Sequence, residues 1–224
     1  MPRIARIVGA SCPHHIVQRG NNKEKLFSDK EDYAKYLSLL ERYSTEKEAL
    51  ILAYCLMSNH VHLLLRPLET KALSKMMQGI TLCYTQYFNT KYGRTGRLWE
   101  CRYHSTIIDE DRYLWSVSRY IENNPVRVGI VKRAEDYKYS SAKAHLLGAR
   151  DILLKELLFD KRELEEYRKF MRMGDEKGIL NEIRRQTRLG KPLGGEGFLK
   201  ALSKRLGRSL VFRPKGRPRK AIIK

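Results

Sequence analysis

The sequence is short of the features that mark secreted, membrane-bound and disulfide-rich proteins. Its 224 residues hold only four cysteines, Cys12, Cys55, Cys83 and Cys101, and no two of them have CxxC spacing. They predict neither a disulfide framework nor a cysteine zinc site, and they favour a reducing cytoplasm. The N-terminus lacks an apolar stretch of signal-peptide length, and the longest apolar run, residues 49–57, falls below the ~18 residues that a membrane span needs. We expect a cytoplasmic protein with no membrane partner.

Acidic residues are scarce beside basic ones. The chain has 25 Asp and Glu against 45 Lys and Arg, a formal net charge of +20, and from Arg184 onward fourteen basic residues accompany a single acid, Glu196. Such a charge favours a polyanionic partner, because each phosphate that Lys or Arg neutralises releases condensed counterions. Ribosomal and other RNA-binding proteins share this property, so the charge indicates a class of partner and no activity.

Several common catalytic motifs are also missing. The sequence contains no GxSxG, no GxxxxGK[ST] and no HExxH. The glycine-rich residues 190–197 follow no apolar strand, so we predict a loop there and no phosphate-binding turn. The acidic residues 109–111 are typical of a helix N-terminus rather than of a two-metal site. A nucleophile must therefore be sought among other residue types.

Periodicity and turn residues predict strands and helices in the order β-α-β-β-α-β-α. Ser28 and Glu31 have capping-box spacing at the start of the first helix, and Asp109 precedes the last one. This order predicts an α+β sandwich, with an antiparallel or mixed sheet and helices on one face. The predicted strands are 14–22, 49–57, 60–66 and 96–108, and the predicted helices are 28–48, 71–88 and 110–124.

The C-terminal third differs in character. Residues 151–189 predict mostly charged helix, and residues 195–210 predict a short amphipathic helix. Residues 212–220 interleave Arg and Lys with Pro and Gly, which prevents helix formation. Their GRPRK stretch is similar to an AT-hook arm that enters the minor groove, although a lysine replaces the usual first arginine. A solvated basic tail is the alternative. The candidate DNA-binding residues are Lys215, Arg217, Arg219 and Lys220.

The stretch LMSNHVHLLLRP, residues 56–67, places two histidines in a predicted strand. Side chains alternate along a strand, so His60 and His62 share one face while Val61 points to the other. Two imidazoles separated by roughly 6–7 Å can converge on one ion, and the open coordination positions would suit catalysis. The alternative is that both are ordinary half-buried histidines bonded to backbone or carboxylates.

A second candidate constellation lies in RYIENNPVRVGIV, residues 119–131. On a helix, Tyr120 and Asn124 are four residues apart and share a face. Asn124 precedes Pro125, so its backbone is expected to leave the helical region. The amide oxygen of Asn124 could complete a two-histidine metal site, with Tyr120 one turn away. A plain packing face is the alternative.

Together these stretches resemble the single-tyrosine HUH transposases of insertion sequences, most of all the REP-associated tyrosine transposases. The resemblance also includes HHIVQRGNNKEKLF and GRLWECRYHSTIIDEDRYLWSVSRYIENNPVR, and it covers roughly residues 1–148. It implies that His60 and His62 are metal ligands, that Tyr120 is the nucleophile and that Asn124 is the third ligand. It further implies a ferredoxin-like α+β fold, a divalent cation such as Mg²⁺ or Mn²⁺, and single-stranded or hairpin DNA as substrate.

We therefore expect a ferredoxin-like sandwich whose central antiparallel sheet carries the HUH motif. The expected domains are a catalytic domain at 1–148, a helical extension at 149–193 and a basic DNA-binding tail at 194–224. The expected activity is cleavage and rejoining of DNA through a 5′-phosphotyrosine, by a monomer or a homodimer. A replication-initiator-type nicking enzyme and a catalytically silent DNA-binding regulator are the alternatives.

Overall fold

The computed structural model describes residues 6–156 and 158–210. Its contacts divide the chain into two units, Met1–Gly194 and Gly195–Lys224. The candidate DNA-binding residues of the tail, from Lys215 to Lys220, lie outside the described residues. The domain boundaries expected from the sequence stay a prediction.

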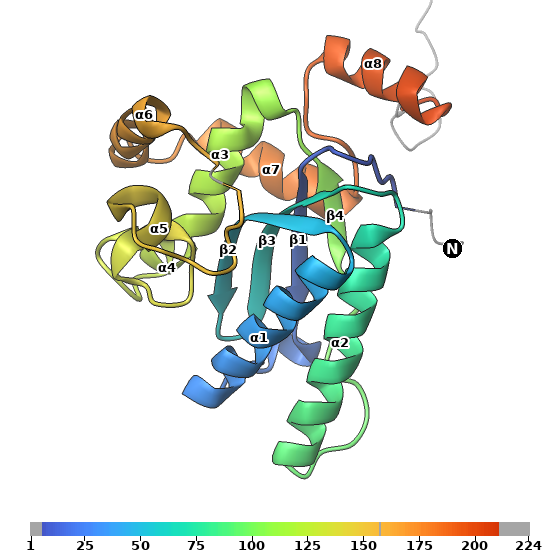
Figure 1. Ribbon diagram of the computed structural model, residues 1–224, viewed down its shortest axis with the longest axis vertical. Helices are drawn as coiled ribbons and strands as arrows, with labels where there is room; N and C mark the ends of the chain where they lie inside the picture. The colour runs from blue at the N-terminus through green and yellow to red at the C-terminus, as the bar shows by residue number, and fades with distance from the viewer. Residues whose placement is uncertain (1–5, 157, 211–224) are drawn as a thin grey trace, which may run out of the picture. The chain divides into compact units, whose positions relative to one another are not determined.

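The first unit is a mixed α+β structure, drawn in Figure 1. Its strands are β1 (His14–Arg19), β2 (Ala49–Met57), β3 (His60–Pro67) and β4 (His104–Ile107). Its α-helices are α1 (Lys30–Glu46), α2 (Ala72–Lys91), α3 (Glu110–Glu122), α4 (Asn124–Arg127), α5 (Ala142–Leu147), α6 (Lys161–Arg172) and α7 (Lys177–Leu189), and Asn21–Lys23 and Ala134–Asp136 are short 3₁₀ turns.

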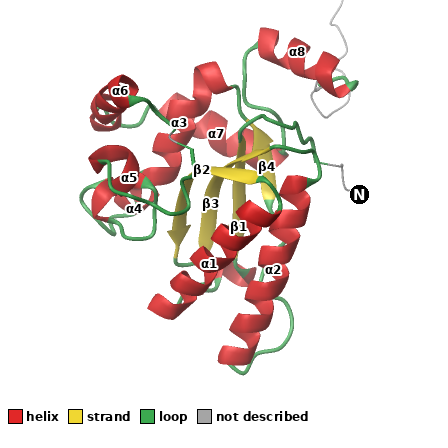
Figure 2. Cartoon of the chain, viewed as in Figure 1, coloured by secondary structure: helices red, strands yellow, loops and turns green. Residues whose placement is uncertain are grey.

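The four strands form one antiparallel sheet in the order β2-β3-β1-β4 (Figure 2). Chain order β-α-β-β-α-β with this strand order is the ferredoxin-like arrangement, so the predicted fold class is confirmed. Only Ser58 and Asn59 separate β2 from β3, which makes these two strands a tight hairpin. The hairpin places the histidine pair at the first residues of β3, beside β1 in the middle of the sheet.

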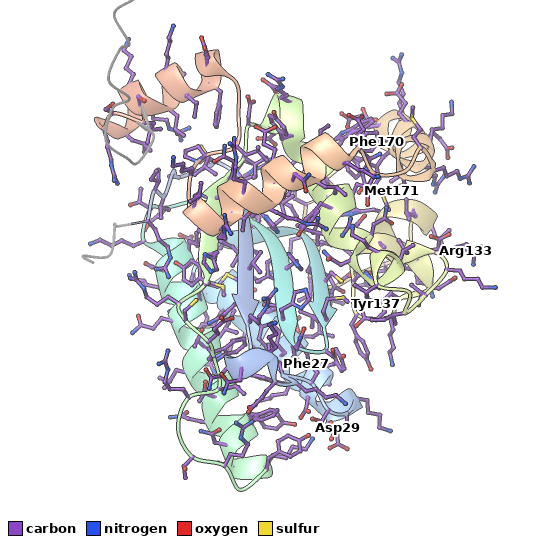
Figure 3. The ribbon with its side chains drawn as sticks, turned by 180° about the vertical axis from the view of Figure 1, so that it is seen from behind. Phe27, Asp29, Arg133, Tyr137, Phe170 and Met171 are labelled. Atoms are coloured by element: carbon purple, nitrogen blue, oxygen red, sulfur yellow. The ribbon has the colours of Figure 1, made fainter. Side chains whose placement is uncertain are left out.

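Helices cover both faces of this sheet, so the prediction of helices on one face is wrong. Val61, Leu63 and Leu65 of β3 lie in the core that α1 and α2 cover, whereas Leu64 lies in a second core with α3 and α7. Figure 3 shows α7 crossing the strands on the face opposite α1 and α2. The strand β2 is apolar on both faces, and such a strand needs a cover on each side.

Two local predictions also differ from the structure. The predicted strand 96–108 is a strand only over His104–Ile107. Before it, Leu98 and Trp99 fill the core from a loop, and Trp99 forms an isolated bridge with Gly20, the residue after β1. The buried side chains of Leu98 and Trp99 therefore gave the sequence a strand-like apolar pattern although the backbone there is irregular.

The cap of α1 lies one residue later than predicted. Asp29, rather than Ser28, accepts hydrogen bonds from the N–H groups of Glu31 and Asp32. The Asp32 carboxylate reaches back to the N–H of Asp29 and, at 2.8 Å, to that of Ser28. Asp32, whose side chain is shorter than that of Glu31, thus makes the second hydrogen bond of the capping box, a role that the sequence assigned to Glu31.

The second unit contains α8 (Glu196–Leu206), which forms the short helix predicted over residues 195–210. Leu202 is its buried residue, and Gly207 ends it in the left-handed conformation with a φ of 58°. Within the described ranges, no helix is long and apolar enough to cross a bilayer.

Burial of His14 on β1 predicts acid sensitivity. Its ring is fully buried between Ser105 and the backbone of Gly9, and burial lowers its pKa to about 4. In the unfolded chain the His14 imidazole takes up a proton below about pH 6.5, whereas in the folded chain it takes one up only below about pH 4. The contribution of His14 to the free energy of unfolding is therefore fully present above pH 6.5 and falls as the pH drops. At pH 5 the loss from this one group is about 2 kcal/mol.

Urea unfolding at pH 7.5 and at pH 5 measures this effect. We expect the His14→Gln variant to lose less stability between the two pH values than the wild type, whatever its stability at pH 7.5. Equal losses in the two proteins would show that His14 does not carry the effect.

Candidate active site

The histidine pair of β3 faces α3. The His60 and His62 rings lie with their centroids 4.9 Å apart, and Val61 between them points into the opposite core. The alternation expected from the sequence is therefore what the structure shows. His62 is 4% exposed and His60 is half-buried, so His60 is the more solvent-accessible of the two.

Tyr120 of α3 lies against the His62 ring. Its ring centroid is 5.5 Å from that of His62, and the two planes are nearly perpendicular at 85°. Val117 and Ile121 of the same helix are fully buried against the sheet, which fixes the rotation of α3 and directs Tyr120 toward the histidines. The Tyr120 hydroxyl has no hydrogen-bond partner within residues 6–156 and 158–210. The phenol of α3 thus lies beside His62, and His62 lies beside His60.

A third histidine, His15 of β1, belongs to the same cluster. Its Nε2 is 3.1 Å from His62 Nδ1, its Nδ1 is 3.0 Å from Thr187 Oγ1 of α7, and its ring centroid is 5.6 Å from that of Tyr120. Sequence reasoning missed this residue. The available signal was strand parity, because His15 alternates with Ile16 of the opposite core, but its contact with His62 depends on how β1 pairs with β3.

Burial keeps the three imidazoles neutral. It lowers the pKa of His15 to about 3 and that of His60 to about 4, and it holds the pKa of His62 well below the usual 6.5. Nearby positive groups add to the effect at His60 and His62, with Arg19 acting on both. Neutral imidazoles keep a nitrogen lone pair, which a metal ligand needs.

Asn124 lies one turn beyond Tyr120, at the start of α4. Its side-chain Nδ2 donates to the carbonyl oxygens of Tyr120, at 2.9 Å, and Ile121, at 3.2 Å. Arg127 donates to its Oδ1 at 3.3 Å. Asn124 therefore caps the end of α3, and among the described contacts its amide oxygen bonds to Arg127 and to neither histidine. One lone pair of this oxygen is still available, since a carbonyl oxygen has two.

Two arginines flank the Tyr120 ring. The Arg127 guanidinium lies 4.9 Å from the ring centroid, and that of Arg184, an exposed residue of α7, lies 6.0 Å away. Asp175, in the loop before α7, accepts from Arg127 Nε and Nη2 at 3.1 and 2.9 Å, and it also pairs with buried Arg119 of α3. The phenol is therefore in cationic surroundings, which favour an anionic substrate.

A cavity of about 790 Å³ is lined in part by Arg127, one of the two arginines beside the Tyr120 ring. Figure 3 labels two of its lining residues, Arg133 and Met171. Its other basic lining residues are Arg127, Lys132, Arg168 and Arg172. Because Arg127 also covers the Tyr120 ring, the cavity and the phenol share one arginine.

The donor set fits a divalent cation. No group of three or more His, Cys, Asp or Glu that could hold a metal occurs in the described part of the chain. Two imidazoles and an amide oxygen are nevertheless a mixed donor set that metals such as Mn²⁺ accept. Both imidazoles already have Nδ1 hydrogen-bonded, His60 to Asn59 Oδ1 at 2.6 Å and His62 to His15, as is usual for histidine ligands.

Comparisons with known proteins place the chain among transposases. The family model described as "Transposase IS200 like" matches residues 9–124, which is 116 of the 224 residues. The chain is similar to a solved REP-associated tyrosine transposase bound to a REP hairpin, with 17% identity over 71% of this chain and 94% of the other, at a TM-score of 0.57. At this identity the similarity supports the fold.

A second solved structure is a transposase candidate from Deinococcus radiodurans R1. It shares 18% identity over 55% of this chain and 97% of its own, and its TM-score of 0.38 is too low to support an argument. No curated protein matches the chain.

Proposed function

Because the chain belongs to the IS200-like transposase family, we propose that it cleaves and rejoins single-stranded DNA, with Tyr120 as the nucleophile. The observation that carries this proposal is the packing of Tyr120 against His62, whose ring lies beside that of His60. The 5.5 Å between the Tyr120 and His62 ring centroids is close enough for one phosphate to contact both the phenol and the histidine site.

His60, His62 and the Oδ1 atom of Asn124 are the residues that would hold a divalent cation such as Mg²⁺ or Mn²⁺. When bound, such a cation withdraws charge from the phosphodiester and orients it for in-line attack. For its part, the protein supplies neutral imidazoles through burial, and it fixes the Asn124 amide on the carbonyls of α3.

Tyr120 would attack the phosphorus of the scissile phosphodiester. The new bond joins the phenolic oxygen to phosphorus, the bond to the 3′-oxygen breaks, the phenol proton passes to solvent and the departing 3′-oxygen takes up a proton. The energy of the phosphodiester stays in the 5′-phosphotyrosine, so another 3′-hydroxyl can reverse the step and join strands without ATP. Arg127 and Arg184 lie where they can pair with the anionic oxygens during the transfer.

We propose DNA that folds as a hairpin as the substrate. The solved relative is bound to a REP hairpin, and this chain carries a net charge of +20. The cavity beside Arg127, lined by five basic and three acidic residues, offers a path for the strand next to the scissile phosphate. We also propose that the tail residues Lys215, Arg217, Arg219 and Lys220 contact the DNA. A cytoplasmic location and a monomeric or homodimeric state stay predictions.

The test is an assay for a covalent adduct. Labelled hairpin DNA is incubated with the protein and Mn²⁺, and the products are separated on a denaturing gel. We expect a slow band that requires Mn²⁺ and disappears with EDTA, and we expect His62→Ala to lose it while His104→Ala, at an exposed strand position, keeps it.

Each alternative has its own outcome in this assay. Tight DNA binding that needs no metal, without an adduct on any hairpin tested, would indicate a catalytically silent regulator. Adducts that form and hydrolyse without joining a second strand would favour a nicking enzyme of the replication-initiator kind. An adduct that persists in EDTA would overturn the role assigned to the metal.

A further inference from the structure

The hydrogen bonds of His15 form a relay from α7 to the candidate metal site. Its ring is 1% exposed and both of its nitrogens are engaged, Nδ1 with Thr187 Oγ1 at 3.0 Å and Nε2 with His62 Nδ1 at 3.1 Å. A neutral imidazole has one donor and one acceptor nitrogen, so the relay has a direction. The direction decides which nitrogen of His62 carries the proton.

The first direction leaves His62 able to bind a metal. If His15 Nδ1–H donates to the Thr187 hydroxyl, His15 Nε2 must accept from His62 Nδ1–H, and the lone pair of His62 Nε2 is exposed to the site. In the second direction Thr187 donates to His15, His15 Nε2–H donates to His62 Nδ1, and His62 Nε2 carries a proton. A protonated nitrogen cannot ligate a cation.

The hydrogen bond of His60 indicates which direction of the relay gives His60 and His62 the same tautomer. Its Nδ1 is 2.6 Å from Asn59 Oδ1, and Asn59 Nδ2 donates to the carbonyl oxygen of Lys23 at 3.2 Å, which fixes the amide orientation. An amide oxygen only accepts, so His60 Nδ1 is the donor and His60 Nε2 has the lone pair. Both histidines present Nε2 to one cation only if the relay runs in the first direction.

We propose that Thr187 and His15 hold His62 in its Nδ1–H tautomer, so that α7 is part of the metal site. His15 and Thr187 are then positioning residues that act through His62. The inference rests on the proposed function, since it assumes a cation on His60 and His62. It assigns a role to a helix that lies beyond residue 124, where the family match ends.

Thr187 allows a matched test, because valine has nearly the same shape without the hydroxyl and serine keeps the hydroxyl. The readout is the Kd for Mn²⁺ of the full chain without DNA, measured by isothermal titration calorimetry. Loss of such an outer hydrogen bond typically weakens metal affinity by about 10–100-fold. We expect that loss in Thr187→Val and in His15→Leu, and we expect a Kd close to that of the wild type in Thr187→Ser. His15→Gln, whose amide oxygen can still accept from His62, should recover part of the affinity.

Nitrogen-15 NMR of the histidine rings gives a second readout. We expect Nδ1–H on both His60 and His62 in the wild type, and a shift of His62 toward Nε2–H in Thr187→Val. Circular dichroism melting separates these effects from loss of the fold. A Thr187→Val variant that binds Mn²⁺ as the wild type does, or a wild type with Nε2–H on His62, would overturn the relay.

Failure of the proposed function looks different. A wild type that binds no Mn²⁺ would contradict the metal site, and the tautomer of His62 would still decide whether the relay has the inferred direction.

Discussion

Replacing Tyr120 with phenylalanine is expected to abolish the covalent protein–DNA adduct. The variant keeps the ring that packs against His15 and His62 and loses only the attacking oxygen. Removing a catalytic nucleophile typically lowers the rate by about four orders of magnitude or more. Because the hydroxyl has no hydrogen-bond partner among the described residues, the variant should fold and bind DNA as the wild type does. The adduct band and a DNA-binding titration measure the two properties.

Tyr113→Phe is the matched control. Tyr113 lies on the same helix, and its hydroxyl bonds to Glu182 on the surface side of α7 at 3.2 Å. We expect this variant to form the adduct at a rate within about threefold of the wild type, because the buried ring stays in place and only the hydroxyl is lost. An adduct that survives Tyr120→Phe would show that another residue is the nucleophile.

Replacing Glu122 with alanine is expected to have the largest effect on stability. The carboxylate is fully buried, accepts hydrogen bonds from Ser141 and Tyr167 at 2.6 and 2.9 Å, and lies 2.6 Å from His145 Nδ1. These contacts join α3 to α5 and α6. Alanine would leave the Tyr167 hydroxyl and His145 Nδ1 without their partner, whereas Ser141 would keep its bonds to the Tyr54 backbone. Removing one partner of a buried network costs about 3–5 kcal/mol.

Urea unfolding with a constant m-value measures this cost. Glu165→Ala, which removes an exposed carboxylate of α6, is the control and should change stability by less than about 1 kcal/mol. A loss in Glu122→Ala no larger than that of the control would show that the network does not hold α5 and α6 to α3. Glu122 is two residues from Tyr120, so we also expect the variant to form the adduct more slowly.

The sequence predicted the parts of the site that depend on local spacing. Strand parity placed His60 and His62 on one face, and helical spacing placed Tyr120 near Asn124. The two predictions needed no knowledge of the fold, because the alternation of a strand and the turn of a helix are set by backbone geometry. The assignment of these four residues to catalysis and metal binding stays a prediction.

The parts that depend on tertiary pairing could not be predicted. His15 meets His62 only because β1 pairs with β3, and Thr187 reaches His15 from 172 residues along the chain. Asp175 similarly joins Arg119 and Arg127 from a loop whose position no local pattern indicates. The strand predicted over residues 96–108 was wrong before His104, because Leu98 and Trp99 are buried from a loop that forms one isolated bridge, between Trp99 and Gly20.

Peptide mapping of the adduct tests most directly whether phenol and histidines form one catalytic site. The protein is incubated with hairpin DNA and Mn²⁺, then digested with nuclease and trypsin, and the products are analysed by mass spectrometry. We predict a deoxynucleotide 5′-phosphate on Tyr120, in the peptide YIENNPVR, and none on this peptide when His60 and His62 are both replaced by alanine. A nucleotide on a different tyrosine, or modification of Tyr120 that does not depend on the two histidines, would contradict the account.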